Sequence, residues 1–172
     1  MDSFYKALPR LVPQDEDTSC WAAVFESWVA AIVPQRKSRP TQKDLIANWA
    51  DLTYDDGSIK PESLTDSLAP SYGMETDWVS PSTITPNYIA TKLSTFGHLV
   101  LGYNRGKRGG HVVVCYGVGR PTGSQQLVSV MDPSNGDGGF KNRGFGEFKG
   151  ISSQGNKVFV GWPKQGLNPD YF

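Results

Sequence analysis

Cys20 is the residue of this chain with the clearest chemical potential, because it lies at the predicted start of a helix. A helix N-terminus presents unpaired backbone N–H groups and the positive end of the helix dipole, and both stabilise a thiolate relative to a thiol. A cysteine in that position is a candidate nucleophile. The alternative is an unreactive core residue, since free cysteine is usually buried. The residues that could assist a nucleophile decide between these two interpretations.

Three further residues have the types that thiol catalysis requires. His111 begins a β-branched run directly after two glycines, where an imidazole could act as the base and then as the acid for the leaving group. Asp132 ends the next predicted strand, where a carboxylate could orient that imidazole. Gln14 precedes Cys20 by six residues, so a turn could bring its amide beside the Cys20 N–H as a second oxyanion donor.

The spacing of apolar residues predicts the elements that hold these side chains. In the segment 19–33, aromatic and branched residues recur at intervals of three and four, which indicates a helix with Cys20 in its first turn. A residue among 17–19 could cap its start, and Pro34 supplies a stop. Further helices are predicted over residues 41–49, 61–68 and 85–97, the first by a Thr-x-x-Asp capping box and the last by a proline at its first position.

After Gly97 the pattern changes to short runs of β-branched and aromatic residues bounded by Gly, Pro, Asn or Ser, which predict strands. The connectors 104–110 and 120–125 are short, so neighbouring strands should pair antiparallel. The glycine-dense stretch 134–150 is interpreted as a loop. Helices followed by a sheet predict the α+β class, with a cleft between the two halves. The predicted strands cover residues 98–103, 111–118, 126–132 and 157–162.

The composition restricts the domain count and the partners. The 172 residues fit a single domain, 1–172. Lys and Arg total 17 and Asp and Glu total 17, so no positive field exists to attract nucleic acid or an acidic membrane surface. We find no pattern of a signal peptide or a membrane span. Two cysteines are compatible with a reducing cytosol, although a bridge between them stays open.

The other candidate groups have simpler interpretations. His98 begins a strand without a well-placed acid downstream, so we expect a capping or surface histidine. Cys115 follows a run of valines and is expected to be an inert core residue. The cysteines and histidines lack the paired spacing of zinc sites, and the acidic segment 51–57 lacks the ligand alternation of a calcium loop and is expected to be a solvated turn. We therefore expect no metal and no cofactor.

Three strings resemble papain-like cysteine peptidases. QDEDTSCWAA is similar to their nucleophile region, and GGHVVVCYGV with VSVMDPSNG is similar to the histidine and acid strands of the bacterial branch, which includes bacteriocin-processing and plant-pathogen effector peptidases. The resemblance spans roughly residues 12–162. It implies a papain-like α+β fold, with the nucleophile helix packed on an antiparallel sheet. The roles it implies are an oxyanion-hole glutamine, a nucleophile, a general base and an orienting acid for Gln14, Cys20, His111 and Asp132, the last being usually Asn in plant and animal members.

The same resemblance implies a cysteine endopeptidase that acts on an intracellular protein. Its effector branch suggests a bacterial toxin that a specialised system secretes, that is active in the cytoplasm of a target cell, and that an immunity protein neutralises in the producer. We expect a monomer whose partners are a protein substrate and this inhibitor. Two alternatives stay open: a papain-fold glutamine deamidase, transglutaminase or other acyl transferase that uses the same thioester, and a catalytically silent binding module.

Overall fold

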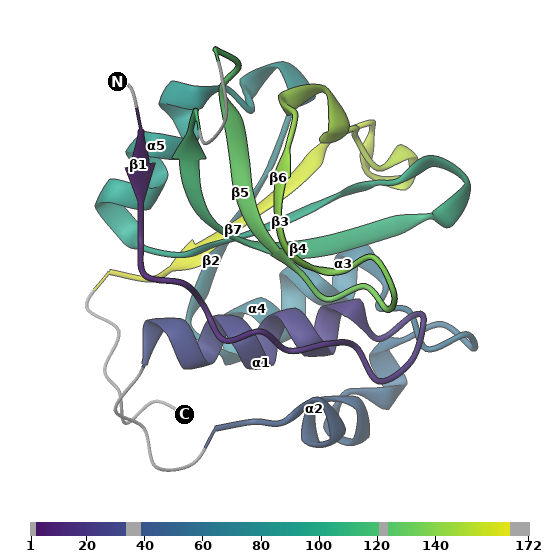
Figure 1. The fold of residues 1–172 in the computed structure, drawn as a ribbon. Coiled ribbons are helices and arrows are strands. Elements are labelled where there is room, and N and C mark those ends of the chain that lie inside the picture. Colours follow the sequence, from purple (N-terminus) through teal and green to yellow (C-terminus); the bar gives the residue numbers. More distant parts are fainter. Residues whose placement is uncertain (1–2, 34–38, 121–123, 166–172) are drawn as a thin grey trace.

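An antiparallel sheet forms the upper half of the molecule in Figure 1, and helix α1 lies across its lower side. The computed structural model describes residues 3–33, 39–120 and 124–165. Within these ranges the sheet has the order β2-β7-β3-β4-β5-β6, and β1 pairs with β4 outside this path. The strands are β1 (Phe4–Tyr5), β2 (Met74–Val79), β3 (Leu99–Asn104), β4 (Gly110–Gly119), β5 (Leu127–Asp132), β6 (Gly139–Arg143) and β7 (Val158–Pro163).

The four helical segments expected from the sequence are present. The segment 61–68 is longer than expected, because α3 continues through a π-helical turn (Leu64–Leu68) into α4. The expected stop of the first helix, Pro34, lies outside the described residues; the helix itself ends at Ile32. The α-helices are α1 (Cys20–Ile32), α2 (Gln42–Asn48), α3 (Pro61–Ser63), α4 (Ala69–Ser71) and α5 (Pro86–Phe96).

Local signals fix the ends of α2 and α5. The Thr41 hydroxyl accepts a hydrogen bond from the Asp44 N–H, and the Asp44 carboxylate accepts one from the Thr41 N–H, which is the expected capping box. Pro86 occupies the first position of α5, where its missing N–H removes no helical hydrogen bond. Gly97 ends that helix with a φ of 97°, a backbone conformation that side chains disfavour.

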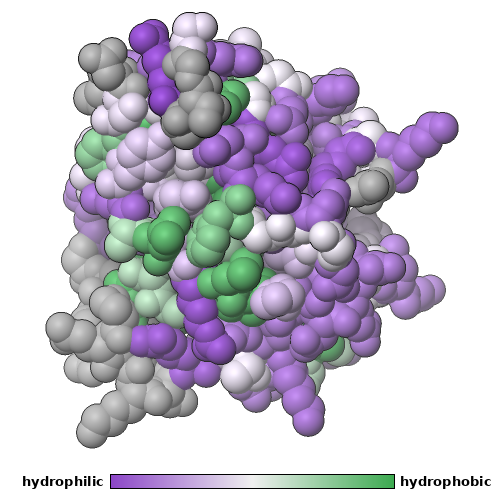
Figure 2. Space-filling model, in the orientation of Figure 1, coloured by the Kyte–Doolittle hydropathy of each residue, from purple (hydrophilic) through white to green (hydrophobic). Residues whose placement is uncertain are grey.

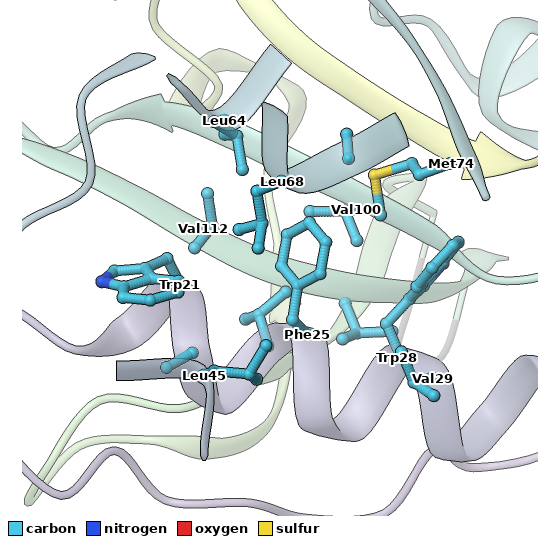
Figure 3. Close-up of a cluster of buried hydrophobic side chains, with 14 of the residues drawn as sticks. Trp21, Phe25, Trp28, Val29, Leu45, Leu64, Leu68, Met74, Val100 and Val112 are labelled. Carbon is cyan, nitrogen blue, oxygen red and sulfur yellow. The ribbon is translucent and has the colours of Figure 1, made fainter. Parts of the chain in front are cut away.

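Two clusters of buried side chains cover the two faces of the sheet. Figure 3 shows the cluster between α1 and the sheet, where Trp21, Phe25 and Trp28 are almost fully buried. The second cluster lies under α5 and includes Cys115. Strand β4 contributes to both, because its successive side chains point to opposite faces. The first cluster places α1 against the strands that carry the predicted histidine and acid.

Three strands were not expected from the sequence. β2 lies among the predicted helices along the chain, yet it pairs with β7 over its whole length and forms one edge of the sheet. β1 is only two residues long and pairs with Gly117 and Val118, near the C-terminal end of β4. β6 lies inside the glycine-dense stretch that was interpreted as a loop, and it pairs with β5. The expected connector 120–125 lies partly outside the described residues.

The N-terminal segment descends from β1 and then runs beside α1 (Figure 1). The Ser27 hydroxyl of α1 donates a 2.6 Å hydrogen bond to the Arg10 carbonyl and fastens the two together. Figure 2 shows hydrophobic residues gathered near the middle of this face of the molecule. The N-terminal segment also exposes two leucines, Leu8 and Leu11. No helix within the described ranges has the length and apolar character needed to cross a bilayer.

Candidate active site

Cys20 is the first residue of α1, and it is a half-buried free thiol. The residue before it, Ser19, caps the helix with its backbone only: its hydroxyl donates to the Glu16 carbonyl and accepts from the Glu16 N–H. The hydroxyl therefore does not occupy the N–H groups of the first helical turn. Those groups keep the positive electrostatic potential of the helix N-terminus beside the sulfur atom.

His111 and Asp132 are brought together by antiparallel pairing. His111 is the second residue of β4, Asp132 is the last residue of β5, and the two strands are neighbours. The Nε2 atom of His111 lies 2.9 Å from the Oδ1 atom of Asp132. Asp132 is completely buried and His111 is 7% exposed, so solvent does not compete for this contact. Because Nε2 is bonded to the carboxylate, Nδ1 is the ring nitrogen available to exchange a proton with Cys20.

The pKa directions of the pair agree with this geometry. Burial lowers the pKa of His111, but hydrogen bonds with Asp132 and Cys20 outweigh burial, so the pKa lies above its ordinary value. Burial raises the pKa of Asp132, but hydrogen bonds from His111 and Ser134 dominate, so that pKa lies well below its usual range. The carboxylate therefore stays ionised and favours the imidazolium form of the histidine.

Gln14 lies in the same site. Its side chain is 6% exposed and lines the cavity into which Cys20 and His111 also face. Its backbone N–H donates a 2.9 Å hydrogen bond to the carbonyl of Pro133, the residue that follows the predicted acid. The four residues predicted from sequence therefore meet in one place, although they come from a loop, a helix and two strands.

Two arginines surround Asp132, and sequence reasoning missed both. Arg143 of β6 places Nη2 2.7 Å from the Asp132 Oδ2 atom, and Arg105 places Nη1 3.9 Å from the same oxygen. Arg105 also donates a 2.7 Å hydrogen bond to the Ser134 hydroxyl, which itself donates to Asp132 Oδ1. Burial lowers the pKa of Arg143, but Asp132 outweighs it and the pKa is raised. The predicted acid is thus an anion balanced by fixed cations.

Tyr103 backs the imidazole ring. It is paired with His111 across β3 and β4, and the two ring centroids lie 5.9 Å apart at an interplanar angle of 85°. Phe148 packs against Tyr103, with the two ring centroids 5.0 Å apart. The glycine-dense stretch 134–150 therefore contributes a buried aromatic wall as well as β6, and it is not a plain loop.

His98 and Cys115 stay out of the site. We expected a capping or surface histidine at position 98, but His98 is buried: it is 8% exposed. Its Nε2 atom lies 2.7 Å from the Ala7 carbonyl, a contact that fastens the N-terminal segment. Cys115 is fully buried, and burial raises its pKa to about 12, as expected of an inert core thiol. These two residues do not line the cavity that holds Cys20.

A cavity of about 950 Å³ opens beside Cys20 and His111. The expected solvated turn 51–57 forms part of its wall. That turn is tied to α1, because the Trp21 indole donates a 3.1 Å hydrogen bond to the Gly57 carbonyl and the Thr18 hydroxyl donates to the Asp56 carbonyl. The apolar part of the lining comes from both halves of the fold and includes Trp21, Ile59, Leu64, Trp78, Val112 and Phe159.

No family model matches the sequence, and no curated protein matches it either. Several solved structures share the fold, including the following two. One is the peptidase domain of Streptococcus ComA, a bifunctional ABC transporter involved in quorum sensing, with a TM-score of 0.57 and 19% identity over 91% of this chain and 100% of that chain. The other comes from a study of the mite allergens Blo t 1 and Der p 1, with a TM-score of 0.59 and 14% identity over 94% of this chain and 71% of that chain. The chain therefore has a papain-like α+β fold, as the sequence predicted.

Proposed function

We propose that this chain is a cysteine endopeptidase that uses Cys20, His111, Asp132 and Gln14. One observation carries the proposal, namely the contacts of the His111 ring. Its Nε2 atom lies 2.9 Å from the buried carboxylate of Asp132, and the same ring is hydrogen-bonded to Cys20 at a helix N-terminus. Cys20 and His111 both line a cavity of about 950 Å³. A nucleophile, a base held by a third group and space for a substrate are the three requirements of this chemistry.

In the first half of the reaction the Cys20 sulfur attacks the carbonyl carbon of the scissile peptide bond, and its proton resides on His111 Nδ1. A C–S bond forms and the carbonyl π electrons move to oxygen. That oxyanion accepts hydrogen bonds from the Cys20 N–H and the Gln14 side-chain amide, which stabilise it relative to the planar substrate. The tetrahedral intermediate then collapses, the C–N bond breaks, and His111 gives its proton to the leaving amine.

In the second half a water molecule attacks the thioester and His111 takes its proton. The C–S bond breaks, the new carboxyl product leaves, and Cys20 regains its proton from His111. Asp132 keeps the imidazole in one orientation through both halves and stabilises its cation.

The cavity lining supports a peptide as the substrate. Ile59 and Leu64 line the cavity with apolar side chains, and Gly109 and Gly110 line it at the entry to β4 without side-chain bulk. Recognition of an extended peptide needs pockets that accept side chains and room for the main chain to lie close to the protein. In this proposal the substrate is an extended segment of a folded or partly folded protein.

The biological setting is proposed from the sequence resemblance alone. The target is a protein in the cytoplasm of another cell, a specialised system delivers the enzyme there, and an immunity protein that covers the cavity protects the producer. Expression of the wild-type chain in a bacterial cytosol without the partner should stop growth, whereas the Cys20→Ala variant should be harmless. Equal growth of the two strains would contradict this setting and leave the chemistry of the site unaffected.

The experiment that tests the peptidase is a proteome-wide search for new N-termini in bacterial lysate. Lysate is treated under reducing conditions with the wild-type protein, with Cys20→Ala, or with Cys115→Ala as the matched control that removes the other thiol. We expect the same new termini with the wild type and Cys115→Ala, and none with Cys20→Ala. A peptide of about ten residues copied from such a site then serves as a reporter substrate.

The same experiment separates the alternatives. Proteins that change mass through Cys20 without any new terminus would replace the peptidase by a deamidase or an acyl transferase. If no terminus and no mass change appears and Cys20 reacts with iodoacetamide no faster than free cysteine, the chain is a binding module.

A further inference from the structure

The two peptide groups on either side of Gln14 are both fixed by hydrogen bonds. In the peptide group that precedes its Cα, the Pro13 carbonyl accepts from the Gln42 side-chain Nε2 at 2.7 Å, and the Gln14 N–H donates to Pro133 at 2.9 Å. In the peptide group that follows, the Asp15 N–H donates to the Gln42 Oε1 atom at 3.1 Å. Each peptide group is a rigid plane, so fixing both planes fixes the two backbone torsions of Gln14.

One side-chain amide makes two of these three bonds. The amide of Gln42 meets a carbonyl with its NH₂ group and an N–H with its oxygen, and the two partners belong to the peptide groups that straddle Gln14. A neighbouring β-strand would contact a residue in the same way. Gln42 therefore holds Gln14 as a strand would, although no strand is adjacent at this point in the described part of the chain.

Gln42 is itself rigidly held. It is the first residue of α2, it is 6% exposed, and its backbone N–H donates a 2.8 Å hydrogen bond to the Glu26 carboxylate of α1. Glu26 is 8% exposed and also pairs with Arg10 at 3.3 Å. Glu26 and Cys20 belong to the same helix. These contacts therefore fix the position of Gln14 relative to α1, the helix that carries the proposed nucleophile.

Simple anchoring of the N-terminal segment would not need this arrangement. Ser27 already fastens that segment through the Arg10 carbonyl at 2.6 Å. Burying a side-chain amide is unfavourable unless all its groups are bonded, and an apolar residue would pack against α1 without that requirement. The contacts of Gln42 are centred on Gln14.

We infer that Gln42 is a positioning residue, which sets the backbone of Gln14 so that the Gln14 amide points to the oxyanion. This inference rests on the proposed function, because it assigns Gln14 to an oxyanion hole. Gln42 itself touches no substrate. Its loss should therefore act through Gln14 and weaken stabilisation of the transition state more than binding of the substrate.

The first arm of the test needs no substrate. The side-chain amide signals of Gln14 are assigned in a ¹⁵N-labelled protein by their absence from Gln14→Ala, and are then compared in Gln42→Met and Ser27→Ala. Methionine has the length of glutamine but makes neither bond, and Ser27→Ala removes a hydrogen bond to the same segment away from Gln14. We expect the Gln14 signals to move or broaden in Gln42→Met and to stay in place in Ser27→Ala. Unmoved signals in Gln42→Met would overturn the inference even if the protein is an active peptidase.

The second arm uses the reporter peptide. Gln42→Met should lower kcat about 10- to 100-fold, as small displacements of catalytic groups do, with KM within about twofold of the wild type. In a Gln14→Ala background the same substitution should lower kcat no further. Losses that multiply in the double variant would show that Gln42 acts elsewhere and would overturn the inference.

Two further results keep the arms distinct. If Gln42→Met does not fold, Gln42→Glu replaces it: a carboxylate keeps the acceptor for Asp15 but faces the Pro13 carbonyl without a donor, so the Gln14 signals should still move and kcat should still fall. If the wild type produces no new terminus in lysate, the peptidase proposal fails, and the amide signals alone decide whether Gln42 sets Gln14.

Discussion

The Nη2 atom of Arg143 lies 2.7 Å from Asp132 Oδ2, while His111 takes the other oxygen of the same carboxylate at 2.9 Å. Asp132 therefore divides its charge between an imidazole and a guanidinium. In the proposed reaction the His111 imidazolium therefore faces an anion that is already compensated on its far side. The electrostatic contribution of Asp132 to His111 is smaller than that of an isolated carboxylate at the same distance.

This sharing makes the neutral variant Asp132→Asn milder than removal of the base. An asparagine oxygen still accepts a hydrogen bond from His111 Nε2–H, and the lost negative charge was partly offset by Arg143. We expect Asp132→Asn to retain more activity than His111→Ala, which should lose on the order of 10²–10⁴-fold in kcat. Steady-state kinetics with the reporter peptide measures both. A greater loss in Asp132→Asn than in His111→Ala would contradict this assignment of the acid.

Arg143→Gln should shift the alkaline limb of the pH–rate profile. Removal of the guanidinium leaves the full charge of Asp132 to act on His111, which raises the pKa of the imidazole above its already raised value. The limb reports loss of the imidazolium proton, so it should move to higher pH, by up to about one unit. Arg143→Lys keeps the positive charge and is the control. A limb that moves equally in the two variants would show that charge is not the cause.

Gln14→Ala should reduce kcat on the order of 10²–10³-fold, because one of the two oxyanion donors is lost while the nucleophile and base remain. KM should change little, since the ground-state carbonyl depends less on that donor. Alkylation of Cys20 by iodoacetamide involves no oxyanion and should proceed at the wild-type rate. Slow alkylation in this variant would place Gln14 in the support of the thiol instead.

The two thiols should differ in reactivity. Cys20 is half-buried beside a histidine at the start of a helix, whereas Cys115 is fully buried with a pKa raised to about 12 by burial. One equivalent of iodoacetamide at pH 7 should label Cys20 and leave Cys115 unmodified, as peptide mass spectrometry would show. Excess oxidant should abolish turnover in both the wild type and Cys115→Ala. Labelling of Cys115 first would contradict the assignment of the nucleophile.

Asp132 should make stability depend on pH in acid. Its folded pKa is lower than that of the unfolded chain, so its contribution is complete above about pH 4, the ordinary carboxyl value, and declines as the pH falls further. At pH 7 the wild type should exceed Asp132→Asn by roughly 1–3 kcal/mol in the free energy of unfolding. Urea titrations between pH 7 and pH 3 should show that difference shrinking. A difference that stays constant to pH 3 would mean that the carboxylate is not stabilised by its partners.

The parts of the site that follow from local signals were predictable. The position of Cys20 at a helix start comes from the periodicity of the residues after it, and the approach of His111 to Asp132 follows from two successive strands with a short connection. The Thr41 capping box and the Pro86 start were equally local. Each of these features is encoded within one or two turns or one hairpin.

The parts that depend on distant pairing were not predictable. Arg143 reaches Asp132 only because a glycine-dense stretch forms β6, and no periodicity marks that strand. Gln42 reaches Gln14 only because α2 packs beside α1. An isolated arginine or glutamine in a sequence is most simply a solvated residue, and only the tertiary register shows which peptide or carboxylate it meets.

The place of β7 in the sheet has a consequence for synthesis. β7 is the last strand along the chain, yet it lies between β2 and β3 instead of at an edge. During synthesis Cys20, His111 and Asp132 are translated before β7. At that stage the position between β2 and β3 is still empty. Vectorial folding can therefore complete the sheet only after residue 163 has emerged, and contacts so distant in sequence form slowly. The nascent chain therefore carries Cys20, His111 and Asp132 before the sheet that positions them is complete, and we expect the proposed hydrolysis only after β7 has joined the sheet.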